Sequence, residues 1–133
     1  MERREKRFRP SVRLGAGLAV VLACLGVLVA SSTPNLTFVD HPLADLLARK
    51  LGHLVAFMAI AFGAGLTAGT SLPRSYTAGL LVMGTASLAL LDEAIQSRIP
   101  GRLSSPIDAA IDILGAVCGI AAWLRFERWR EAR

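Results

Sequence analysis

The sequence predicts an all-α fold: a polytopic membrane protein built as a four-transmembrane-helix bundle, with both termini in the cytoplasm. Three observations predict it. The 133 residues are 53% hydrophobic with a mean hydropathy of +0.51, which is too apolar for an ordinary soluble domain. The apolar residues fall into four blocks near the ~20 residues that cross a ~30 Å hydrocarbon layer. Basic residues gather on one side of these blocks. We therefore expect a single domain over residues 1–133.

The first block, Leu14–Ser31, follows a basic segment and could be either a cleaved signal peptide or a retained anchor. Its apolar run is longer than in most signal peptides, and Leu28-Val29-Ala30 is a poor cleavage site, so a retained anchor is the favoured interpretation. Small residues recur along it at helical spacing and predict the close approach of a neighbouring helix. They are Gly15, Ala19, Ala23, Gly26 and Ala30.

The second block, Leu51–Ser71, follows the longest connection in the chain, residues 36–50. In that connection Asp40 is expected to cap a short helix that begins near Pro42 and lies in the membrane interface. The second span then begins near Lys50. The turn at 72–75 contains a proline and predicts that the second and third spans are antiparallel neighbours.

The third and fourth blocks are Tyr76–Ile95 and Ile107–Phe126, and the chain turns between them at Pro100. Ser105 is expected to cap the fourth helix, with Pro106 in the first helical position. The fourth block also carries a small-xxx-small pattern, which predicts a helix contact face. This pattern is Gly115 and Gly119.

The positions of the basic residues indicate what the net charge of +5 is for. Most of the 15 Lys and Arg residues lie before the first span, in the short second connection or in the tail, which are on the same side of the bundle. The positive-inside rule places that side, and both termini, in the cytoplasm. No aromatic residues interleave with this charge, so we expect the lipid bilayer and no nucleic acid as a partner.

Polar and charged residues gather where the second span begins, the third ends and the fourth begins, so they lie at a similar depth near the outer side. A charged carboxylate at the bilayer centre costs ~2.5–3.5 kcal/mol, which directs such groups into the bundle and towards partners. Helical spacing places them on shared faces. The residues are Lys50, His53, Asp92, Glu93, Gln96, Arg102, Asp108 and Asp112.

These side chains form one candidate site. Glu93 or Asp92 is the expected catalytic acid or base and His53 the base or proton shuttle. The expected ligand contacts are Lys50, Gln96, Arg102, Asp108 and Asp112. No cofactor and no metal site is assigned. A metal-dependent enzyme, with a cation held by His53 and the carboxylates, is weaker than the metal-free acid/base enzyme, because the sequence has no second clustered histidine and no HExxH pattern.

Structural roles compete with these assignments. Asp108 could instead complete a capping box with Ser105. Arg102 could pair with Glu93 or Asp108 and tie down the turn, and His53 could be a hydrogen-bonded structural histidine.

An ordered series of these residues resembles the VanZ-like family over about residues 46–122. The series is Lys50-x-x-His53, Asp92-Glu93-x-x-Gln96, Pro100-Gly101-Arg102, Asp108 and Asp112-x-x-Gly115-x-x-x-Gly119. Asp112 departs from the pattern, where many members are expected to have asparagine. The resemblance implies a bacterial inner-membrane protein with an extracytoplasmic polar site and an association with resistance to the glycopeptide teicoplanin. It implies no particular reaction.

Four functional hypotheses follow. The leading one is a pocket that binds an anionic or lipid-linked cell-wall component. The second is an intramembrane acid/base enzyme on a lipid-linked substrate, and the third is a small proton-coupled carrier. In the fourth, the polar cluster only locks three helix ends together. The sequence leaves open whether the protein is an enzyme, and it leaves the oligomeric state open.

Overall fold

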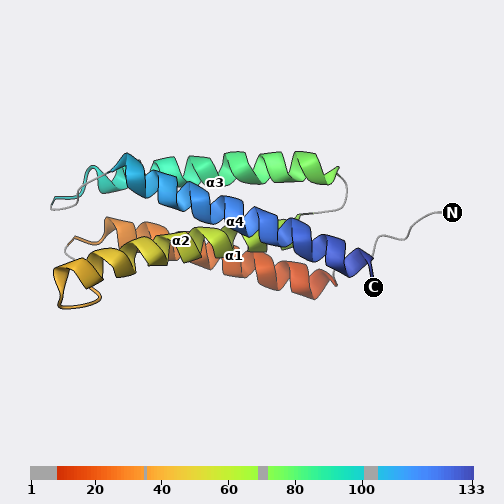
Figure 1. The fold of residues 1–133 in the computed structure, drawn as a ribbon, viewed down its shortest axis with the longest axis horizontal. Coiled ribbons are helices and arrows are strands. Elements are labelled where there is room, and N and C mark those ends of the chain that lie inside the picture. Colours follow the sequence, from red (N-terminus) through yellow and green to blue (C-terminus); the bar gives the residue numbers. More distant parts are fainter. Residues whose placement is uncertain (1–8, 35, 69–71, 101–104) are drawn as a thin grey trace.

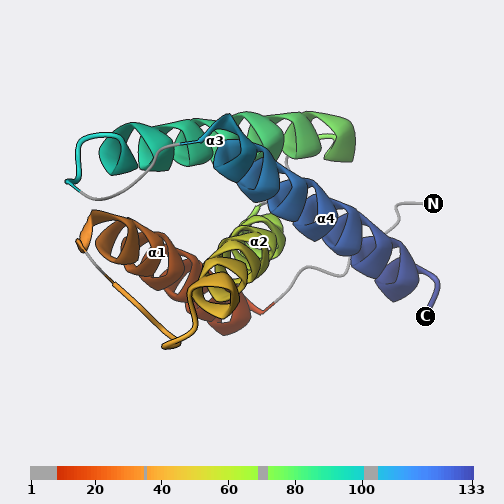
Figure 2. The same ribbon diagram turned by 60° about the vertical axis from the view of Figure 1, so that its left-hand side comes forward.

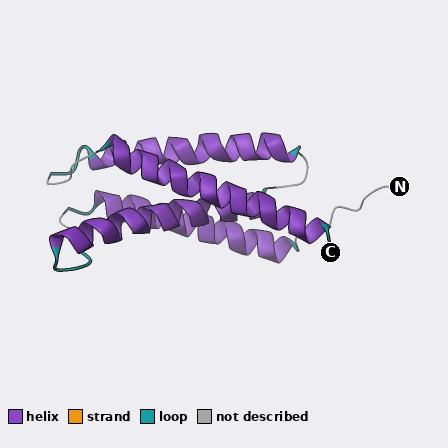
Figure 3. Cartoon of the chain, in the orientation of Figure 1, coloured by secondary structure: helices purple, strands orange, loops and turns teal. Residues whose placement is uncertain are grey.

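A computed structural model describes residues 9–34, 36–68, 72–100 and 105–133. Four helices make up this part of the chain: α1 (Pro10–Ser32), α2 (Pro42–Thr67), α3 (Arg74–Gln96) and α4 (Pro106–Glu131). Each is long and apolar enough to cross a membrane, and the described residues contain no strand (Figure 3). The helices lie side by side, and the start of α1 lies at the same end of the bundle as the end of α4 (Figure 1). This confirms the predicted all-α four-helix bundle. We call the opposite end of the bundle, where α1 ends and α4 begins, the distal end.

The exterior of the bundle is strongly apolar. Large side chains on all four helices are exposed, for example Leu14, Met58, Met83 and Leu114. Exposure of so extensive an apolar surface to water is unfavourable, whereas contact with lipid chains is not. The arrangement is that of a multi-pass membrane protein.

α4 packs most extensively on α2 and also lies against α3 (Figure 2). Two of its glycines make this possible, because an added Cβ would overlap a backbone carbonyl of α2: that of Leu54 at Gly115 and that of Met58 at Gly119. The predicted contact face of the fourth helix is thereby confirmed. It holds α2 and α4 closer together than any larger residue would allow.

The small residues of α1 behave differently from the prediction. Gly15 and Gly26 have open space where a Cβ would be added, so no helix approaches them closely. α1 packs mainly on α2, where Val20 lies against Gly63. The predicted close approach thus holds only for part of the stripe: Ala23 packs against the buried core, whereas Gly15 and Gly26 have no close neighbour and the distal part of the stripe lines a cavity.

α2 begins earlier than predicted. It runs unbroken from Pro42, so the expected short interfacial helix forms its first turns, and the residue before it, His41, makes no side-chain cap. The expected cap by Asp40 is wrong. The side chain of Asp45 reaches back and accepts hydrogen bonds from the backbone N–H groups of Phe38 (2.6 Å) and Val39 (3.4 Å). An acceptor one turn inside the helix thus holds the preceding loop against it.

The start of α4 agrees with the prediction. The Ser105 hydroxyl accepts a hydrogen bond from the backbone N–H of Ile107 at 3.2 Å, and Pro106 is the first helical residue. At the opposite end of the bundle, Arg13 donates to the carbonyl of Thr67 at 2.7 and 3.2 Å, which ties α1 to the end of α2.

Candidate functional site

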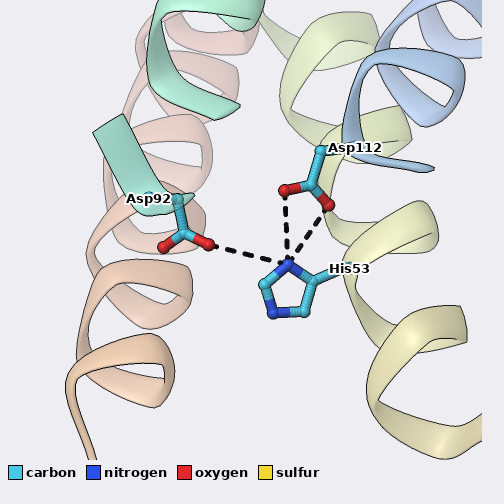
Figure 4. A group of neighbouring side chains, drawn as sticks. All are labelled: His53, Asp92 and Asp112. Atoms are coloured by element: carbon cyan, nitrogen blue, oxygen red, sulfur yellow. Dashed lines mark hydrogen bonds and ion pairs between the residues drawn. The ribbon is translucent and has the colours of Figure 1, made fainter. Parts of the chain in front are cut away.

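Three buried polar side chains from two different helices meet a histidine from a third near the distal end. Asp92 is 0% exposed, Asp112 is 2% exposed and Gln96 is 6% exposed. The Nδ1 atom of His53 lies 3.2 and 3.4 Å from the two carboxylate oxygens of Asp112 and 3.8 Å from Oδ2 of Asp92 (Figure 4). We call His53, Asp92 and Asp112 the histidine–carboxylate cluster.

The glycine contact between α2 and α4 explains why His53 meets Asp112. Gly115 lies against the backbone of Leu54, the residue that follows His53. Asp112 precedes Gly115 by three residues and therefore lies on the same face of α4, one turn nearer the distal end. The close backbone approach brings the carboxylate to the imidazole.

Gln96 orients the second carboxylate. Its Nε2 donates to Oδ2 of Asp92 at 2.7 Å, as the predicted i,i+4 relation requires, and to the hydroxyl of Ser31 at 3.4 Å. Ser31 is fully buried at the end of α1, so all four helices contribute to this polar core. Sequence reasoning missed Ser31, although a serine in the last turn of an apolar span was a usable signal.

Two other predicted site residues form a separate pair nearer the end of the bundle. Lys50 on α2 forms an ion pair with Asp108 on α4, and both side chains are partly exposed. Asp108 therefore does not complete the capping box. In a capping box, the Asp108 carboxylate would accept a hydrogen bond from the backbone N–H of Ser105. That N–H donates to the Glu93 carboxylate instead.

Glu93 is thus separated from its neighbour Asp92. Adjacent residues on a helix point about 100° apart, so one carboxylate enters the cluster while the other holds the start of α4. Arg102, a predicted ligand contact, lies outside the described residues. The residues predicted to form one site thus form three groups: the histidine–carboxylate cluster, the Lys50–Asp108 ion pair, and Glu93 bound to the backbone of Ser105.

A cavity of about 500 Å³ lies between α1 and α2 on the distal side. Its walls are small or apolar residues of both helices and two residues of the loop between them, and its two polar lining residues are Arg49 and His53. The lining comprises Ala23, Gly26, Val27, Ala30, Leu36, Phe38, Ala48, Arg49, Gly52, His53 and Ala56. Gly52 and Gly26 have open space where a Cβ would be added. The small residues of the predicted stripe on α1 thus leave room for this cavity.

His53 connects the cavity with the cluster. Its Nδ1 faces the two carboxylates, and its other ring nitrogen points away from both (Figure 4). The ring lies nearly parallel to that of Phe57, with 17° between the planes and 6.5 Å between the centroids. A histidine that is oriented by a carboxylate and lines a cavity can exchange a proton with a bound molecule.

Arg49 is the second polar residue of the cavity. Its Nη2 pairs with Oδ2 of Asp45 at 2.9 Å, while its Nε is buried without a hydrogen-bond partner among the described residues. Sequence reasoning did not include Arg49 in the site. The i,i+4 spacing from Asp45 indicated the ion pair, but nothing in the sequence indicated the cavity.

No protein-family model matches the sequence, and no curated protein or solved structure matches the chain. The residues and their geometry are therefore the basis of the functional assignment.

Proposed function

We propose that this chain is a VanZ-like protein of the bacterial inner membrane that binds an amphipathic, lipid-linked component of the cell envelope from the extracytoplasmic side. The apolar chain of the ligand occupies the cavity between α1 and α2, and its anionic group lies at Arg49 and His53. The observation that carries the proposal is an apolar cavity whose polar lining consists of those two side chains. The family membership rests on the ordered residue series alone.

The size and lining of the cavity suit such a ligand. Pockets for small molecules are typically about 300–1,000 Å³ and mostly apolar, with a few polar groups that orient the ligand. The cavity, at about 500 Å³, lies in this range. In a membrane, however, an apolar chain gains little by leaving lipid for an apolar wall. Specificity must therefore come from the polar end of the ligand.

Arg49 provides the polar contact. A guanidinium presents several N–H donors in a planar fork and binds phosphate or carboxylate groups in two-point contacts. One edge of the Arg49 guanidinium already pairs with Asp45, and the buried Nε has no hydrogen-bond partner in the described structure. The Arg49 side chain is 36% exposed, so part of the guanidinium remains accessible to an anionic ligand in the cavity.

The proposed orientation combines charge and topology. Among the described residues, most Lys and Arg lie near the start of α1, the start of α3 and the end of α4, which share one end of the bundle, and the cavity and the cluster lie at the other end. With the basic end in the cytoplasm, the site faces outwards. That is the side on which cell-wall components are assembled and on which glycopeptides act.

The test is binding of a polyisoprenyl phosphate to the full chain in lipid nanodiscs, measured by native mass spectrometry. We expect Arg49→Gln to reduce the bound fraction at least tenfold. Arg98→Gln is the matched control, because Arg98 is an exposed arginine near the same end of the bundle. Equal binding by wild type and Arg49→Gln would contradict the proposal.

Acid/base catalysis is the second candidate, and the contact between His53 and Asp112 favours it. A carboxylate on one ring nitrogen orients the imidazole, so that the other nitrogen can act as a base towards a molecule in the cavity. If this holds, His53→Gln should abolish turnover of a lipid-linked substrate that still binds. Binding without any product would leave the protein as a binding protein.

A further inference from the structure

We infer that His53, Asp92 and Asp112 form a binding site for one divalent transition-metal ion of the zinc class. Each residue comes from a different helix, α2, α3 and α4 respectively. The inference goes beyond the proposed ligand and does not depend on it, because it rests on the buried cluster and not on the cavity.

The spacing of the donor atoms supports the site. One ligand atom from each residue lies within 4.8 Å of the others. In a tetrahedral site with zinc–ligand distances of about 2.1 Å, the ligand atoms are about 3.4 Å apart. His53 Nδ1 lies 3.2 Å from Asp112 Oδ1 and 3.8 Å from Asp92 Oδ2, on either side of that value. The three donor atoms lie within 4.8 Å of one another, so binding of an ion would draw the two carboxylates together.

The charge of the cluster favours a bound cation. Asp92 and Asp112 are almost completely buried inside transmembrane helices, and no Lys or Arg side chain of the described structure pairs with either. Two carboxylates beside a neutral imidazole would place a charge of about −2 at membrane depth, which is strongly unfavourable without compensation. A bound divalent ion supplies that charge.

A separate observation points to a missing partner. Oδ1 of Asp92 is buried and has no hydrogen-bond partner in the described structure. Oδ2 of Asp92 is the oxygen directed at His53 (Figure 4), and it also accepts a hydrogen bond from Gln96 at 2.7 Å. Carboxylates that bind metals are commonly held in this way by a second hydrogen-bonded group. Gln96 therefore acts as a positioning residue.

The donors indicate the class of ion. An imidazole with two carboxylates suits zinc and similar transition ions, whereas magnesium prefers all-oxygen ligands and keeps its waters. Three protein ligands that leave one position open are the pattern of zinc sites that bind a further molecule. In that position the ion would polarise a phosphoryl or carbonyl oxygen.

The experiment is a zinc titration of the chelator-treated full chain in lipid nanodiscs by calorimetry. We expect one zinc ion per chain, with affinity reduced at least tenfold by His53→Gln and by Asp112→Asn. Gln96→Leu should weaken binding about tenfold, as loss of a supporting hydrogen bond does at metal sites. Asp108→Asn is the matched control, since it neutralises a carboxylate on the same helix outside the cluster and should leave zinc affinity unchanged.

X-ray absorption of the zinc-loaded wild type decides the matter even if a variant fails to fold. Nitrogen and oxygen ligands with a single imidazole support the site. Absence of saturable binding, sulfur ligands, or equal affinity in wild type and Asp112→Asn would overturn it. Polyisoprenyl phosphate binding is measured separately on chelator-treated protein. Failure of zinc binding alone thus rejects the metal site, and failure of Arg49-dependent binding alone rejects the proposed function.

Discussion

The imidazole Nδ1 of His53 lies 3.2 Å from a carboxylate oxygen of Asp112, and this contact joins α2 to α4 inside the membrane-spanning part of the bundle. The same histidine lines the cavity between α1 and α2. Any change in the packing of α4 on α2 should therefore alter both the buried cluster and the wall of the cavity.

Gly115→Ala should destabilise the protein by about 1–3 kcal/mol, the usual cost of overpacking. An added Cβ would overlap the Leu54 carbonyl and push α4 away from α2. The measurement is unfolding of the purified protein in mixed micelles with increasing SDS. Gly79→Ala, at an exposed glycine of α3 with open space around it, is the control and should be neutral or slightly stabilising. Equal stability of the two variants would contradict the close packing.

Gly52→Leu should fill the cavity and reduce binding of a polyisoprenyl phosphate at least tenfold, while the stability of the bundle is nearly unchanged. Gly52 lines the cavity, and a Cβ there meets no atom within 4 Å, so the larger side chain displaces only the ligand. Binding by native mass spectrometry and unfolding in SDS are measured on the same preparation. Gly79→Leu provides the matched addition of a leucine on the exterior. Unaltered binding in Gly52→Leu would place the ligand elsewhere.

Glu93→Ala should lower stability by about 1 kcal/mol, whereas Glu93→Gln should be close to wild type. The carboxylate accepts a hydrogen bond from the Ser105 backbone, and a glutamine oxygen accepts the same bond whereas alanine does not. Unfolding in SDS compares the three proteins. If Glu93→Gln is as stable as the wild type but has lost binding or turnover, Glu93 has the catalytic role that the sequence suggested.

Glycopeptide susceptibility tests the function in cells. We expect a bacterial strain that expresses the wild type to be less susceptible to teicoplanin than the same strain with an empty vector. His53→Gln should remove that difference at unchanged membrane protein level, because the imidazole links the cluster with the cavity. Glu93→Gln should retain it. Parallel loss of protein and phenotype would support a purely structural cluster, and no effect from the wild type would contradict the proposed VanZ-like function.

The sequence was sufficient to predict the architecture and the end of the bundle at which the polar residues gather. Runs of apolar residues near membrane-spanning length indicated four helices, and the structure has four. The constant rise of a helix converts position in a span into depth, so acids near the outer ends of the spans had to lie near one end of the bundle. The i,i+4 relation likewise predicted that Gln96 contacts Asp92.

The tertiary structure alone decided which polar groups meet. Lys50 pairs with Asp108, Glu93 binds the Ser105 backbone and Ser31 reaches Gln96, although many other pairings share the same depth. A partner across two helices depends on how each helix is rotated about its axis and how closely the pair approaches. Packing of all four helices sets both of these, and no single segment of the sequence contains them. For the same reason the cavity, which is the space left between two stripes of small residues, became visible only when α1 and α2 were placed together.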